Sequence, residues 1–74
     1  MNTETAIGKL NVLERLKSSF VGNPRYLIEI NGTAYRTEPN SSLGYSVTNY
    51  DGDQVRAQVR IYRGKWAIQS VKTI

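Results

Sequence analysis

The sequence predicts a mostly β domain, because two stretches have the alternation and the turn chemistry of β-hairpins. In residues 54–71, apolar and polar side chains alternate with the period of two expected of half-buried strands, and an Arg-Gly pair in the middle supplies a two-residue turn. In residues 25–37 a similar alternation is interrupted by Asn-Gly, a strong signal for a type I′ turn. Two antiparallel hairpins are therefore the most legible part of the chain.

The N-terminal part of the chain fits two patterns. Residues 1–5 are polar, and we expect them to be disordered. Residues 6–16 place apolar side chains at helical spacing, but they also alternate as a strand would. On local pattern alone the helix is favoured, because Leu-Glu-Arg-Leu-Lys is a strong helix former. Gly8 and the β-branched Ile7 and Val12 favour the strand instead.

In the middle of the chain, residues that favour loops and turns separate the predicted strands. Residues 17–24 are rich in Ser, Gly, Asn and Pro and predict a loop. A strand follows to Ile30, and the return strand covers residues 33–37. Pro39 ends that strand, and the N-cap residues after it predict a short helix or a further strand whose apolar side chains cover the core. Residues 49–53 are a turn with two aspartates, which lacks the other ligands of a calcium loop.

The last hairpin has a defined register. A turn at Arg63-Gly64 places Tyr62 opposite Lys65 and Ile61 opposite Trp66. One face is apolar, and the other is basic and polar. We expect a core that combines this apolar face with the other strands: Leu10, Val12, Tyr26, Ile28, Ile30, Tyr35, Val55, Val59, Ile61, Trp66 and Ile68.

Composition excludes several classes of function. The chain has 74 residues, a length that suits one small domain with little room for a deep cleft. It contains no cysteine and no histidine, which removes disulfides, Cys/His zinc sites and the usual nucleophile and general-base residues. We therefore expect no enzyme, no cofactor and no metal. No apolar run is long enough for a membrane span, so we expect a soluble, cytoplasmic protein.

The charge is unevenly distributed. The formal net charge is +4, and every acidic residue lies at or before Asp53. The residues after it are basic where they are charged: Arg56, Arg60, Arg63, Lys65 and Lys72. This asymmetry favours an anionic partner, either nucleic acid or an acidic protein surface, although a solvated strand face has the same composition.

Several short segments resemble small phage-encoded proteins of unknown function. They are Glu14-Arg15-Leu16-Lys17-Ser18-Ser19, Gly22-Asn23-Pro24-Arg25-Tyr26, Asn31-Gly32, Arg36-Thr37, residues 42–49 with Tyr45, and the basic hairpin. In proteins of that kind the segment matching residues 8–16 is a strand, and the host cytoplasm would be the compartment. The resemblance implies no particular activity.

With residues 8–16 as a strand, the order becomes three strands, a short helix and two strands. This order predicts a small five-stranded antiparallel β-barrel, OB-like or SH3-like, with one short helix between strands 3 and 4. The alternative is an α+β domain with an N-terminal helix on a four-stranded antiparallel sheet. In either case residues 6–74 form a single domain, as a monomer or a homodimer.

The basic hairpin face is the predicted binding surface. In an OB-like barrel the ligand crosses the central strands between two hairpin loops, which here are residues 17–23 and 63–65. Stacking on an exposed tyrosine would add to phosphate contacts. The predicted nucleic-acid-binding residues are Arg36, Arg56, Arg60, Tyr62, Arg63 and Lys65. The alternative is a protein-interaction module that uses this face to dock on a host or virion protein.

Overall fold

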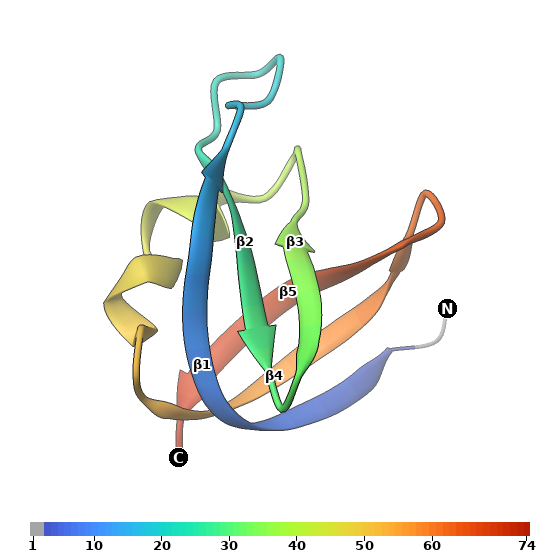
Figure 1. Ribbon diagram of the computed structural model, residues 1–74. Coiled ribbons are helices and arrows are strands. Elements are labelled where there is room, and N and C mark those ends of the chain that lie inside the picture. The colour runs from blue at the N-terminus through green and yellow to red at the C-terminus, as the bar shows by residue number, and fades with distance from the viewer. Residues whose placement is uncertain (1–2) are drawn as a thin grey trace.

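The computed structural model describes residues 3–74 and shows a closed five-stranded β-barrel (Figure 1). The strands are β1 (Glu4–Leu16), β2 (Arg25–Ile30), β3 (Thr33–Thr37), β4 (Gln54–Tyr62) and β5 (Lys65–Thr73). Two 3₁₀ turns, η1 (Ser42–Tyr45) and η2 (Val47–Tyr50), connect β3 to β4. Among residues 3–74 there is no helix with the length and apolar character needed to cross a membrane.

β1 is the longest strand and pairs with two neighbours. Residues 4–9 pair with β4, from Glu4 opposite Val59 to Lys9 opposite Gln54, and residues 10–16 pair with β2. The strand predicted for residues 8–16 is therefore confirmed, and the α+β alternative with its N-terminal helix is wrong. The expected disorder of residues 1–5 is also wrong for residues 4 and 5, which are held in the β1–β4 ladder; residues 1 and 2 lie outside the described residues.

The strand order around the barrel is β1-β2-β3-β5-β4, and β3 runs parallel to β5. The sequence predicted an entirely antiparallel barrel, which is not possible for a closed ring with an odd number of strands. One pair must be parallel, and the β3–β5 pair takes that role while the other four pairs are antiparallel. This order, with the helical segment between β3 and β4, is the OB-like alternative of the prediction.

Both hairpins have the predicted turns. Asn31 and Gly32 have φ of 52° and 81°, and Arg63 and Gly64 have φ of 52° and 80°, as type I′ turns require. Within β4 and β5 the register also agrees with the prediction, with Tyr62 opposite Lys65. A bulge near Gln58 shifts the register farther from the turn.

The short helix predicted between the third and fourth strands is present as the two consecutive 3₁₀ turns. Ser41 caps the first turn, because its side-chain Oγ accepts a hydrogen bond of 3.1 Å from the backbone N–H of Leu43. Val47 is fully buried beneath the segment. Gly44 lies so close to the start of β2 that a Cβ there would overlap the carbonyl oxygen of Pro24. The segment therefore closes one end of the barrel.

The core fills the barrel interior much as predicted. Leu10, Ile28, Val55 and Ile68 are completely buried, and the half-buried Tyr26, Val12 and Trp66 pack against the buried cluster. The Trp66 ring meets the Tyr35 ring edge-on, with centroids 5.9 Å apart.

Ile61 is the exception, because its side chain is 54% exposed. In the part of the chain that the structure describes, pairing between β1 and β4 ends at Glu4 and Val59. No strand of residues 3–74 covers the tip of the β4–β5 hairpin, which projects from the barrel in Figure 1. The assignment of Ile61 to the core is therefore wrong.

Two isoleucines give a direct test of this core. We expect Ile28→Ala to lower the free energy of unfolding by about 2–5 kcal/mol, because it leaves a cavity in the barrel. Ile61→Ala makes the same chemical change at an exposed position, and should cost less than about 1 kcal/mol. Urea unfolding followed by Trp66 fluorescence measures both. Equal losses in the two variants would contradict the assignment of inner and outer positions.

Candidate nucleic-acid interface

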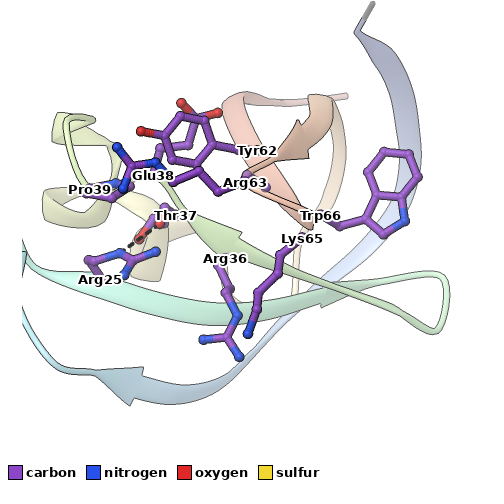
Figure 2. A pocket seen from close by; sticks show the side chains of 10 residues that line it. Arg25, Arg36, Thr37, Glu38, Pro39, Tyr62, Arg63, Lys65 and Trp66 are labelled. Carbon is purple, nitrogen blue, oxygen red and sulfur yellow. Dashed lines mark hydrogen bonds between the residues drawn. The ribbon is translucent and has the colours of Figure 1, made fainter.

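A groove lies between the end of β3 and the β4–β5 hairpin (Figure 2). Its volume is about 270 Å³, and it is open to solvent. Its lining comes from the start of β2, the end of β3 and the residues on either side of the hairpin turn. We call it the cationic groove, and its lining residues are Arg25, Arg36, Thr37, Glu38, Pro39, Tyr62, Arg63, Lys65, Trp66 and Ala67. The side chain of Trp66 points away from the others in Figure 2.

A row of residues across three strands lies at the cationic groove. Arg36 of β3 is opposite Ala67 of β5, and Ala67 is opposite Arg60 of β4. Residues opposite each other on neighbouring strands share one face of the sheet, so all three belong to the outer face. Ala67 is small and buried, and the two arginines rise on either side of it. The barrel topology thus places two cations beside one depression.

Arg60 has a carboxylate partner. Its Nη2 donates to Oε1 of Glu38 at 2.7 Å and its Nε donates to Oε2 at 2.9 Å, which makes a bidentate pair. The hydrogen bonds to the Glu38 carboxylate raise the pKa of the Arg60 guanidinium above its ordinary value, so Arg60 stays charged at all physiological pH. Glu38 itself is buried, with 8% of its surface exposed.

The other cations of the groove are not neutralised in this way. The Nε of Arg25 donates to the backbone oxygen of Thr37 at 3.0 Å, which fixes its side chain over the end of β3. Within residues 3–74, no carboxylate forms an ion pair with Arg25, Arg36, Arg63 or Lys65. Arg36 and Lys65 extend in the same direction in Figure 2. Because Arg60 offsets Glu38, the groove keeps the charge of four cations.

Tyr62 is the aromatic side chain at the edge of the groove. It is half-buried, and its ring lies 5.5 Å from the guanidinium carbon of Arg60 and 5.4 Å from that of Arg63, measured to the ring centroid. These are cation–π distances. Tyr62 therefore links the Arg60–Glu38 pair to the turn.

The structure brings together most of the predicted binding residues. Arg36, Tyr62, Arg63 and Lys65 line the cationic groove, and Arg60 borders it through its pair with Glu38. Arg25 also belongs to the groove, although it was not among the predicted residues. The sequence feature that could have predicted this is the position of Arg25 between a proline-containing loop and the alternating strand.

Arg56 does not join this group. It is four residues before Arg60 on β4, roughly 13 Å along the strand. It lies opposite Lys72 of β5, and the two cations line a separate depression of about 360 Å³ with Gln58, Ser70 and Val71. The basic face of the last hairpin is thus divided into two cationic areas, of which only one adjoins the end of β3.

The acidic turn has a structural role. The Asp51 carboxylate accepts a hydrogen bond of 2.8 Å from the backbone N–H of Val12, and the Asp53 backbone oxygen accepts one of 2.9 Å from Leu10. These bonds tie the segment before β4 to β1. In the described part of the chain no group of three or more carboxylate side chains is gathered as a metal site would require.

Comparisons of the sequence with known protein families, with curated proteins and with solved structures give no match. The chemistry of the groove is therefore the basis for assigning a function.

The Arg60–Glu38 pair can be tested with two variants of the same strand. We expect Arg60→Glu to lower Tm clearly, because it places a second carboxylate against the buried Glu38. Arg56→Glu makes the same charge change at an exposed position beside Lys72, and should change stability by no more than about 0.5 kcal/mol. Thermal melts at one pH compare the two. If the Arg60→Glu and Arg56→Glu variants have the same Tm, the Arg60–Glu38 pair does not stabilise the fold.

Proposed function

We propose that the protein is a small non-enzymatic binding module that holds nucleic acid in the cationic groove. The observation that supports this most directly is the convergence of Arg25, Arg36, Arg63 and Lys65 on one concave surface, with no carboxylate paired to any of them among residues 3–74. Like charges repel, so such a cluster lowers stability unless an anion is bound. Phosphate oxygens match guanidinium donors in geometry and in charge.

The position of the groove agrees with this proposal by analogy of fold. OB-like barrels bind oligonucleotides on the face of strands 2 and 3, between the β1–β2 and β4–β5 loops. The cationic groove lies at the end of β3 against the β4–β5 turn, and Arg25 brings the end of the β1–β2 loop to it. Fold alone does not assign a function. The analogy supports the proposal because the groove lies where OB-like barrels bind oligonucleotides and is also lined by cations.

Residues 3–74 hold no constellation that supports a catalytic step at neutral pH. The sequence has neither histidine nor cysteine, and the one carboxylate that is buried among the described residues, Glu38, is held by Arg60. Phosphate contacts from fixed cations supply affinity, and Tyr62 at the groove edge offers a ring on which a base can stack.

Charge reversal in the two cationic areas tests the proposal. We expect Arg36→Glu/Lys65→Glu to abolish most binding to labelled oligonucleotides, measured by fluorescence anisotropy. Arg56→Glu/Lys72→Glu changes the net charge by the same amount outside the groove, and should bind within a few-fold of wild type. With four phosphate contacts, the plot of log Kobs against log salt concentration should have a slope of about −3. The Arg36/Lys65 variant should have a shallower slope.

Two outcomes would contradict the proposal. Equal loss in the two double variants would mean that net charge alone governs binding and that the groove is not a site. No binding at low salt would remove nucleic acid as the ligand and leave the acidic protein surface predicted from the sequence.

A further inference from the structure

The loop between β1 and β2, residues 17–24, exposes an apolar tip. Phe20 is 89% exposed and is the most exposed large hydrophobic side chain among residues 3–74, and its neighbour Val21 is 54% exposed. Tyr45 of η1, itself 65% exposed, donates from its hydroxyl to the backbone oxygen of Gly22 at 3.4 Å. A chain this short needs most of its apolar side chains for the core, so a phenylalanine ring exposed to water indicates an interaction site.

The tip is held in one conformation. The N–H of Gly22 donates to the oxygen of Ser19 at 2.9 Å, so residues 19–22 form a β-turn with Phe20 and Val21 at its centre. The N–H of Ser19 donates to the oxygen of Asn23 at 2.9 Å, and the Oγ of Ser19 accepts from the N–H of Asn23 at 3.1 Å. Because these bonds close the turn on itself, the backbone that presents the ring is held in place before any ligand arrives.

The same loop is fixed to the wall of the cationic groove. The side-chain amide of Asn23 donates to the backbone oxygen of Pro39 at 3.0 Å, and Pro39 lines the groove. Arg25, two residues farther on, lines the groove as well. In Figure 1 this loop and the segment after β3 rise at the same end of the barrel.

The surroundings of the tip are basic. Arg15 donates to the Oγ of Ser18 at 3.3 Å at the base of the loop, Lys17 is exposed within it, and Arg25 follows it. Residues 15–28 contain no acidic side chain. The cations therefore continue from the groove to the loop that presents Phe20, which is the pattern of a path for a polyanion.

We infer that the ligand is single-stranded nucleic acid, and that Phe20 is a second stacking platform where the strand leaves the groove. This rests on the proposed function. Arg25 and Arg36 are half-buried in a concavity of about 270 Å³. A flexible single strand can bend its phosphates into such a concavity, whereas a duplex is stiff and pays a deformation energy to do so. The bases of a single strand are also free to stack on an outlying ring, whereas those of a duplex are already stacked within it.

The test combines one variant with strands of two lengths. Labelled oligothymidylates of about 4 and about 15 nucleotides span the range of site sizes known for a single barrel of this type. We expect the longer strand to bind more tightly than the shorter one and more tightly than a duplex of equal length. Phe20→Ala should weaken binding of the longer strand by about 5- to 150-fold, the effect of losing one stacked base. It should leave the shorter strand, held in the groove, nearly unaffected.

Three variants make the result interpretable. Ile7→Ala removes a comparable exposed apolar side chain, 46% exposed, on the half of β1 that pairs with β4, and should bind as wild type does. Phe20→Trp keeps an aromatic ring and should keep the affinity for the longer strand. Arg36→Glu/Lys65→Glu reports on the groove. Phe20→Ala should melt at the wild-type temperature, because its ring is outside the core.

The failures of the two proposals differ. If the groove variant loses binding while Phe20→Ala matches Ile7→Ala on both strands, the stacking platform is wrong and the proposed function stands. Duplex binding as tight as that of the longer single strand overturns the single-stranded ligand. No binding by the wild-type protein at low salt overturns the proposed function and this inference together.

Discussion

β1 pairs along residues 4–9 with β4 and along residues 10–16 with β2, and every other element takes its position from this double pairing. The two partners are far from each other in the sequence, so β1 is the strand that turns two hairpins into one closed surface. Closure gives each of the five strands a hydrogen-bonded neighbour on both sides along the body of the barrel. It also leaves a chain of this length with an interior large enough for a fully buried aliphatic core.

The groove follows from where β1 stops. Among residues 3–74, nothing pairs with the β4–β5 hairpin on the β1 side beyond the pair of Glu4 with Val59, and the hairpin projects past the body of the barrel (Figure 1). The projecting part bears Tyr62, Arg63 and Lys65, and the Arg60–Glu38 pair fastens its base to the end of β3. One carboxylate thus orients a hairpin wall while the other cations remain available. The same overhang exposes Ile61.

The parts of the fold set by neighbouring residues were predictable. Asn31-Gly32 and Arg63-Gly64 fix their turns through positive φ, and the registers of both hairpins follow from those turns. β1 was not predictable from its own residues. Its Leu-Glu-Arg-Leu segment favours a helix locally, and only pairing with distant strands makes it extended.

The candidate site shows the same division. Alternation along β4 predicted that Arg60 and Tyr62 share the outer face, which is correct. Alternation could not separate Arg56 from the groove, because that depends on where β3 ends beside β5. The ion pair between Arg60 and Glu38 joins residues that are 22 positions apart in the sequence, so it cannot be predicted from alternation along one strand. The exposure of Phe20 could not be predicted either, because a loop prediction for residues 17–24 does not say which of its side chains point into solvent.

The β3–β5 ladder is the shortest in the barrel, with Arg36 opposite Ala67 and Thr37 opposite Ile68. Local opening of a protein begins where few hydrogen bonds and contacts must break, so this seam is the part of the barrel that separates at the lowest cost. The cationic groove straddles it, with Arg36 on one side and Lys65 on the other. An anion that contacts both sides binds only the closed seam, and by mass action it shifts the barrel away from its open forms. The fraction of groove that is occupied and the protection of the β3–β5 amides from hydrogen exchange therefore both depend on the equilibrium between the closed and the open ladder.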